Sequence, residues 1–130
     1  MSKFVSDTMA LVLHLEKRKM PNKAKEIFEA TEKSEHEVYI PAMVVAEIGY
    51  LSEKGRVETT ISAVEAKMEQ CEYFKEKPLD AAVVKASFEI DDIPELHDRL
   101  IAGTAKAMGL DIITNDPDME QSAHVNTIWR

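Results

Sequence analysis

Four carboxylates lie at positions where a charge could serve chemistry or has little structural reason to be present. Asp7 ends the run KFVSD, and Asp116 lies just beyond the apolar run LDIIT. Glu47 lies in the otherwise apolar stretch PAMVVAEIGYL, and Asp98 opens the segment DRLIAGTAKAM. Carboxylates in one pocket repel one another unless cations are present, and oxygen ligands select hard ions such as Mg²⁺ or Mn²⁺. These residues therefore predict a divalent-metal site, which could activate water for hydrolysis.

Each acid also has an ordinary structural explanation when it is taken alone. Asp98 suits the first turn of a helix, where the helix dipole favours an anion, and Asp116 in NDPD suits a turn. Asp7 suits the N-cap of a following helix. Glu47 has the weakest explanation, because a carboxylate among apolar residues is costly unless it is paired or metal-bound. The prediction therefore depends on all four acids meeting in one place.

The apolar spacing indicates which elements would bring these acids together. Short apolar runs alternate with segments of helical periodicity from one end of the chain to the other. We predict strands at 3–7, 37–40, 73–75, 110–114 and 125–129, and helices at 8–15, 24–31, 42–53, 57–71, 80–90 and 98–108. This alternation predicts an α/β fold, a three-layer α/β/α sandwich around a mainly parallel sheet of four to five strands. Such sheets bind ligands at the carboxyl ends of their strands, where Asp7 and Asp116 would lie.

Length and composition limit the organisation of the chain. With 130 residues, 14.7 kDa and 45% hydrophobic content, the chain fits a single packed domain spanning residues 1–130. No run of about 18 uncharged apolar residues occurs, so we expect no membrane segment and a cytoplasmic protein. The only cysteine, Cys71, excludes an intrachain disulfide and a zinc knuckle, and we expect it in a helix core.

The net charge of −8 has the wrong sign for a protein that coats nucleic acid with its whole surface. Any contact with RNA must therefore be local. Arg99, Lys106, Lys54 and Arg56 are candidates for such a contact because they lie near the acids in the sequence. The alternative for each of them is an ordinary solvated cation.

Three segments resemble the PIN domain family and, within it, the VapC-type toxins of toxin–antitoxin pairs. VSDTMALV resembles the family's opening strand, Asp–Thr and helix, and IPAMVVAEIGYL resembles its second segment with a Glu. IPELHDRLIAGTAKAMGLDIITNDPDM resembles the C-terminal signature, which is the most specific of the three. The resemblance runs nearly from end to end and keeps all four acids in order. Met9 departs from it, since the family often has a small residue there, and the segment 55–78 shows no motif.

The resemblance implies a PIN-like fold with a known set of site residues. It assigns the family's catalytic, metal-binding acids to Asp7, Glu47, Asp98 and Asp116. Thr114 matches a hydroxyl residue that orients the acids, and Asp118 is either an outer carboxylate of the site or a turn residue. The resemblance further implies a Mg²⁺- or Mn²⁺-dependent endonuclease acting on single-stranded RNA, a homodimer, and a small VapB-like antitoxin protein that covers the site.

Other kinds of function stay open at this point. A PIN-like fold could hold metal or a partner protein with weak catalysis or none, although intact acids favour catalysis. A phosphotransfer receiver needs paired acids early in the chain, and a haloacid-type phosphatase needs Asp-x-Asp after its first strand. The chain has Asp7-Thr8-Met9 and no acid pair before Asp7, so both of these classes fit poorly.

Overall fold

A five-stranded sheet forms the centre of the computed structural model, which describes residues 1–130. The strands are β1 (Ser2–Ser6), β2 (His36–Pro41), β3 (Phe74–Lys77), β4 (Asp111–Ile113) and β5 (Thr127–Ile128). Their order is β3-β2-β1-β4-β5, and every neighbouring pair is parallel. Because parallel strands need crossover connections, at least one helix lies between each strand and the next.

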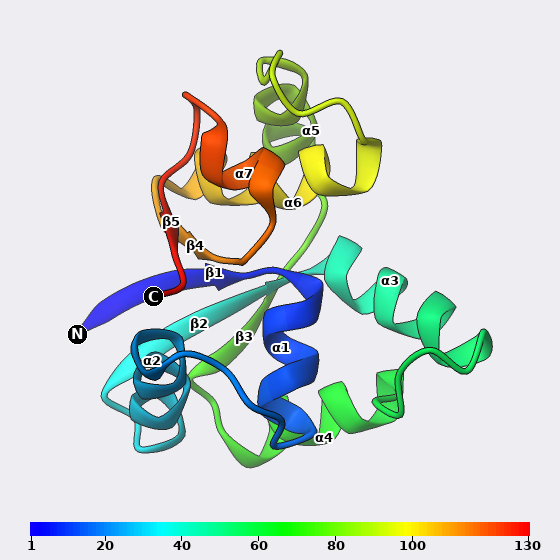
Figure 1. Ribbon diagram of the computed structural model, residues 1–130, viewed down its shortest axis with the longest axis vertical. Helices are drawn as coiled ribbons and strands as arrows, with labels where there is room; N and C mark the ends of the chain where they lie inside the picture. Colours follow the sequence, from blue (N-terminus) through cyan, green and yellow to red (C-terminus); the bar gives the residue numbers. More distant parts are fainter.

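Helices cover both faces of this sheet (Figure 1). They are α1 (Thr8–Leu15), α2 (Asn22–Glu32), α3 (Ala42–Glu53), α4 (Ile61–Gln70), α5 (Ala81–Phe88), α6 (Leu96–Met108) and α7 (Pro117–Gln121). Figure 1 shows α5, α6 and α7 on one side and α1, α2 and α4 on the other, with α3 leaving the sheet edge sideways. The predicted three-layer α/β/α sandwich with a parallel sheet is confirmed.

No helix combines the length and the apolar character needed to cross a membrane.

The strand order places a crevice next to β1. From β1 the sheet grows to β2 and β3 on one side, whereas β4 and β5 lie on the other. A crevice for ligands opens at the carboxyl edge of an α/β sheet where the order reverses in this way. Ser6 pairs with Ile113 at the end of β1 and β4, so the next residues, Asp7 and Thr114, leave the sheet together at that edge.

One hydrophobic cluster of 22 buried residues holds the helices against the sheet. Val5 and Ile112 contribute to it from the strands, and Ile101 contributes from α6. Each such aliphatic side chain stabilises the fold by about 1.5–3 kcal/mol when it is fully buried. At Gly103 the two helices α5 and α6 approach closely, since a Cβ there would lie 1.8 Å from the Ser87 hydroxyl oxygen. This packing fixes the position of α6 and, with it, Asp98.

The observed elements agree with the predicted ranges to within two residues at each end, except for two. The helix predicted from residue 57 begins at Ile61, because the Thr60 hydroxyl caps it by accepting from the Ala63 amide at 3.1 Å. The short helix α7 was not predicted, since NDPD was interpreted as a turn. Its N-cap is Asp116, whose carboxylate accepts from the Met119 amide at 3.0 Å.

Candidate metal centre

Two of the predicted acids leave the sheet on adjacent strands. Asp7 directly follows β1, and its amide donates to the Ile113 carbonyl at 3.1 Å, which extends the pairing of β1 with β4. Asp116 lies three residues beyond the end of β4. Its amide donates to the Thr114 hydroxyl at 3.0 Å, and that hydroxyl in turn donates to the Asp7 carboxylate. Thr114 therefore links the two acids through one side chain.

Asp7 is a buried carboxyl with two hydrogen-bond donors but no cationic partner. One of its oxygens accepts from the Ala10 amide at 2.8 Å as the N-cap of α1, and the other accepts from Thr114. Burial raises the pKa of Asp7 from 3.8 to about 6 against the effect of these hydrogen bonds, and the neighbouring charges of Asp116 and Glu47 raise the pKa further. A buried carboxyl among other acids holds its charge poorly unless a cation lies beside it.

The other two acids reach the same crevice from helices. Glu47 lies in the second turn of α3, half-buried, and its carboxylate accepts from the Thr8 hydroxyl. Asp98 lies in the first turn of α6, but the N-cap of this helix is Glu95, which accepts from the His97 and Asp98 amides at 3.0 Å each. Helix capping could have explained why Asp98 lies at this end of the helix, but Glu95 is the residue that caps it. The carboxylate of Asp98 is left with no hydrogen-bond donor.

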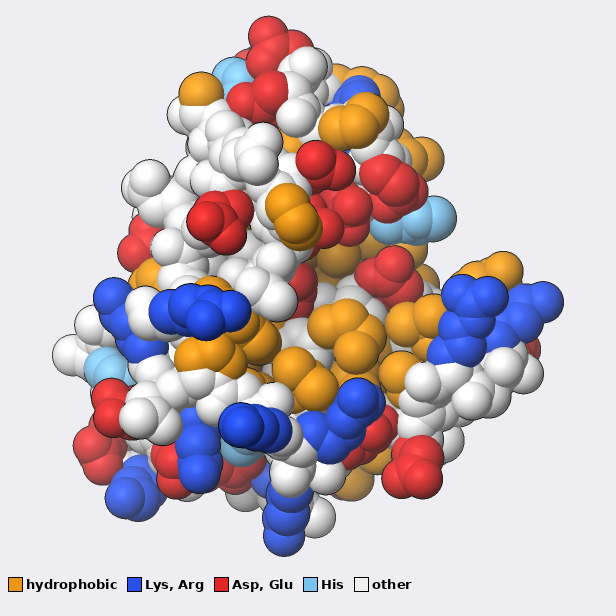
Figure 2. Space-filling view, viewed as in Figure 1, with side chains coloured by type: hydrophobic (Ala, Val, Ile, Leu, Met, Phe, Trp, Pro, Cys, Tyr) orange, Lys and Arg blue, Asp and Glu red, His pale blue; other side chains and the backbone are white.

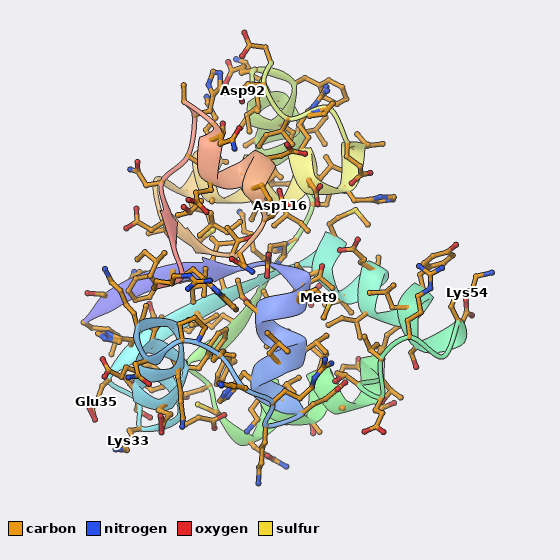
Figure 3. All side chains as sticks on the ribbon, in the orientation of Figure 1. Met9, Lys33, Glu35, Lys54, Asp92 and Asp116 are labelled. Carbon is orange, nitrogen blue, oxygen red and sulfur yellow. The ribbon has the colours of Figure 1, made fainter.

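The four acids line one cleft of about 360 Å³. Its walls are formed by Asp7, Thr8, Met9, Ala10, Leu13, Glu47, Leu51, Asp98, Ile101, Asn115, Asp116, Pro117, Met119 and Trp129. Figure 2 shows red acidic side chains above an orange apolar floor in the hollowed middle of this face. In Figure 3, Met9 and Asp116 lie near each other at the carboxyl end of β1, on α1 and at the start of α7. The structure thus brings together all four acids that the sequence singled out.

The electrostatics of the cleft favour a bound cation. Burial, followed by the charges of Asp116, Glu95, Glu47 and Asp7, raises the pKa of Asp98 to about 7. No Lys or Arg side chain is among the residues that line the cleft. The donor set consists of carboxylate oxygens, which fits Mg²⁺ or Mn²⁺ better than zinc. The residues present therefore fit a hard divalent ion.

The residues that line the cleft are not the same set as the site residues expected from the sequence. Asp118 is exposed in the first turn of α7 and is not among the residues lining the cleft. Thr8, Asn115 and Trp129 do line it, although the sequence did not assign them a role. Thr8 and Asn115 each adjoin a predicted acid in the chain, so adjacency could have indicated them. Trp129 is brought in by the last strand, and no local signal in the sequence indicates this.

The cations proposed from the sequence divide into two groups. Arg99 donates to the Ile93 carbonyl at 2.9 Å and lies over the Phe88 ring, and Lys106 forms an ion pair with Glu89 at 2.9 Å. Both therefore have partners away from the cleft. Lys54 is exposed at the end of the arm that α3 forms (Figure 3), and Arg56, two residues further along the chain, is also exposed. None of the four lines the cleft.

A second acidic group lies in the connection that precedes α6. Ligand atoms of Asp91, Asp92 and His124 lie within 4.8 Å of one another. Asp92 accepts from the Ser122 hydroxyl at 2.7 Å and from the Ala123 amide at 2.8 Å, and Asp91 lies 3.0 Å from a ring nitrogen of His124. These contacts tie the connection between α5 and α6 to the segment before β5. The group is thus explained by its own hydrogen bonds.

Comparison with known proteins identifies the family. The model of the PIN domain family matches residues 4–125, and the chain belongs to that family. No curated protein sequence matches the chain.

Solved structures share the fold across nearly the whole chain. VapBC2 from Rickettsia felis, bound to a promoter DNA fragment, superposes with a TM-score of 0.74 at 19% identity, covering 98% of this chain and 99% of that one. DNA-bound VapBC from Salmonella typhimurium gives 0.72 at 19% identity, with 98% of each chain covered. VapC20 of Mycobacterium tuberculosis, a sarcin-ricin loop cleaving toxin, gives 0.62 at 15% identity, covering 95% of this chain and 98% of that one. At these identities the similarity establishes the fold.

Proposed function

We propose that this chain is a divalent-metal-dependent endoribonuclease of the VapC type, the toxin of a toxin–antitoxin pair. The observation that carries the proposal is the convergence of Asp7, Glu47, Asp98 and Asp116 from four elements into a cleft that no cation lines. Membership of the PIN domain family supports it. Solved structures with this fold include VapBC complexes and a toxin that cleaves the sarcin-ricin loop.

In this proposal the four acids hold Mg²⁺ or Mn²⁺. The bound ion would lower the pKa of a water molecule and neutralise charge on the phosphoryl oxygens of the scissile phosphodiester. The chain's own residues hold the acids in place: Thr114 orients Asp7, and Thr8 orients Glu47. Each hydroxyl fixes one carboxylate oxygen; the second oxygen of Glu47 has no donor, whereas that of Asp7 also accepts from the Ala10 amide. Met9 and Ile101 contribute apolar surface to the walls of the cleft.

Cleavage of RNA in the presence and absence of divalent ions tests the proposal. We expect the purified chain to cut single-stranded RNA with Mg²⁺ or Mn²⁺ and to lose this activity when EDTA is added. Restoring the activity with excess Mg²⁺ controls for damage by the chelator. Cleavage that continues undiminished in EDTA would contradict the metal-dependent mechanism.

The proposal includes a VapB-like antitoxin and a homodimer. The antitoxin is supported by the VapBC complexes among the structures with this fold. The homodimer is supported by exposed apolar side chains on α5 and at the start of α6, where Val84, Phe88 and Leu96 are 39%, 62% and 50% exposed. An apolar patch on a small protein often marks an interface. Sedimentation at micromolar concentration should show a dimer, and a 14.7 kDa species alone would count against it.

A further inference from the structure

The chain has a basic hollow at the opposite end of α1 from the carboxylate cleft. The hollow has a volume of about 870 Å³ and lies between the end of α1, the connection to α2, α2 itself and α4. Five cations line this basic hollow: Lys17, Arg18, Lys19, Lys25 and Lys67. Only two carboxylates, Glu29 and Glu32, accompany them. In a chain with a net charge of −8, this is a local concentration of positive charge.

Several of these cations have no partner in the fold. Lys67 is paired with Glu32 at 2.8 Å, and Arg18 lies 3.5 Å from Glu16. Lys17, Lys19 and Lys25 are exposed and form no ion pair. Their charges are therefore free to act on a ligand. Helix α2 adds to the same field, because it begins beside the hollow with no side-chain cap and no acidic residue in its first turn.

The basic hollow and the carboxylate cleft adjoin each other along α1. Leu13 lines both of them, and Met9 and Trp129 line the cleft. The carbonyl of Trp129 accepts from the Ala24 amide at 3.3 Å, so this cleft residue contacts the start of α2, where Asn22 and Lys25 line the hollow. Figure 2 shows the same sequence of surfaces, with red side chains in the cleft, an orange floor and blue side chains below. The eight residues of α1 separate the two ends by roughly 12 Å, a span of a few nucleotides.

The order of these surfaces matches a single strand of nucleic acid. Proteins that bind single strands combine a basic groove that follows the phosphates with aromatic side chains on which bases stack. The hollow supplies the lysines, and Trp129 supplies a half-buried aromatic ring. An acidic polypeptide could also bind the lysines. Its carboxylates further along towards the cleft would, however, be repelled by the acids there. A phosphate polymer has charges that suit a metal-loaded cleft at one end and lysines at the other.

We propose that an RNA strand runs from the carboxylate cleft along α1 to the basic hollow. Lys17, Lys19 and Lys25 bind its phosphates, and Trp129 stacks on a base between the two ends. This inference rests on the proposed ribonuclease function and gives that function a binding site outside the cleft. It predicts that substrates long enough to reach the hollow bind more tightly than short ones.

The only tryptophan of the chain provides a direct test, because Trp129 fluorescence reports stacking at this position. The probe is single-stranded oligouridylate, titrated into full-length protein carrying Asp98→Asn to prevent turnover. The test variant adds Lys19→Ala and Lys25→Ala, and the control adds Lys33→Ala and Lys85→Ala. All four of these lysines are exposed and unpaired, and neither Lys33 nor Lys85 lines the hollow or the cleft. Both variants therefore remove the same charge.

We expect the oligonucleotide to quench Trp129 and the test variant to bind it about tenfold more weakly at low salt. The salt dependence of log K should become shallower by about 1.4 in the test variant, since each lost phosphate contact on a single strand contributes about 0.7. The control should bind as the parent protein does. Trp129→Phe should keep most of the affinity and Trp129→Ala should lose about tenfold, which separates stacking from a general effect on folding.

Equal affinities in the test and control variants would overturn the inference, as would binding, detected by anisotropy, that leaves Trp129 unquenched. Tight binding of oligoglutamate that depends on Lys19 and Lys25, with RNA binding unchanged, would assign the hollow to an acidic protein partner instead. The fluorescence readout needs no turnover, so it remains decisive for a chain that cuts no RNA. If the wild-type chain cuts RNA and the Lys19→Ala/Lys25→Ala variant cuts long strands equally well, the path fails while the ribonuclease function stands.

Discussion

The two acidic groups of this molecule have the same kind of residue in very different surroundings. In the connection before α6, hydrogen bonds from the Ala123 amide and the Ser122 hydroxyl lower the pKa of Asp92. In the cleft, burial and neighbouring carboxylates raise the pKa of Asp98 to about 7. Figure 3 shows Asp92 at the end of the upper helical layer that lies away from Asp116. The fold supplies hydrogen bonds that stabilise the charge of Asp92, whereas the carboxylate of Asp98 has no hydrogen-bond donor.

This difference shows that closeness of acids is a poor criterion for a metal site by itself. Asp91, Asp92 and His124 hold their ligand atoms within 4.8 Å of one another. Asp92 accepts two hydrogen bonds from the chain, and Asp91 lies within hydrogen-bond distance of His124. In the cleft, Asp98 has no hydrogen-bond donor, Glu47 has one, and no cation is among the lining residues, so the fold leaves negative charge there that an ion from solution can compensate. An ion stabilises such a pocket more than it stabilises a satisfied cluster.

The largest expected effect is on turnover. Asp98→Asn and Asp116→Asn should each lower kcat/KM on single-stranded RNA by more than about a hundredfold, because each removes a proposed metal ligand. Asp92→Asn removes the same charge from the other group and should stay within about twofold of the wild type. Circular dichroism of each variant checks that the fold is intact. A cleft variant that retains wild-type turnover removes that residue from the proposed site.

The next expected effect is on the stability of the metal-free protein. Burial raises the pKa of Asp7 from its usual 3.8 to about 6 in the folded chain, so folding favours its protonated form. The stability from this group is present below about pH 4 and is lost as the pH rises through about 6. Asp7→Asn should therefore equal the wild type near pH 4 and exceed it by on the order of 2 kcal/mol near pH 7.5. Urea unfolding in EDTA measures both values.

Comparing Asp7→Asn with the wild type at each pH also cancels the contributions that other titrating groups make to stability. Burial lowers the pKa of His14, so its contribution to stability grows with pH, opposite in sign to that of Asp7. Both proteins contain His14, and the effect cancels in their difference. A stability gain that does not change with pH would mean that Asp7 is ionised as easily in the folded chain as in the unfolded one.

The smallest expected effect is on thermal stability when Asp92, outside the cleft, is neutralised. Asp92→Asn should lower the thermal midpoint by no more than a few degrees at neutral pH, because the carboxylate there accepts two hydrogen bonds and is exposed. The sign is opposite to that of Asp7→Asn, since the folded-state pKa of Asp92 is lowered. Thermal unfolding of the two variants side by side gives the comparison. Stabilisation by Asp92→Asn would mean that this group, too, is strained by its charge.

Much of the fold was predictable because its signals are local. The alternation of apolar runs and helical periodicity predicted the strands and most helices, and the helix 42–53 was predicted with its observed bounds. Asp7 and Asp116 could be placed at one sheet edge because parallel strands end there. The helix α7 escaped prediction because a five-residue helix has too few turns to show periodicity.

The parts of the site that escaped prediction depend on tertiary packing. Trp129 reaches the cleft because β5 pairs with β4 at the sheet edge. The residues near Trp129 in the sequence carry no signal that predicts this pairing. The capping of α6 by Glu95, which frees Asp98, was likewise hidden, since both acids suit that end of a helix. Sequence proximity suggested Arg99 and Lys106 as contacts for RNA, but packing gave both of them other partners. The free lysines instead gather at the far end of α1.

Calorimetric titration with Mn²⁺ tests the central claim most directly, using wild-type protein, Glu47→Gln and Asp92→Asn, with RNA cleavage measured on the same samples. Glu47 is half-buried in the cleft with a single hydroxyl donor, so we expect its neutralisation to weaken Mn²⁺ binding and suppress cleavage together. Asp92→Asn should leave both unchanged. Loss of Mn²⁺ affinity in Glu47→Gln when the wild-type protein cuts no RNA would favour a metal-binding module without catalysis. Unchanged Mn²⁺ binding and cleavage in Glu47→Gln would contradict the account.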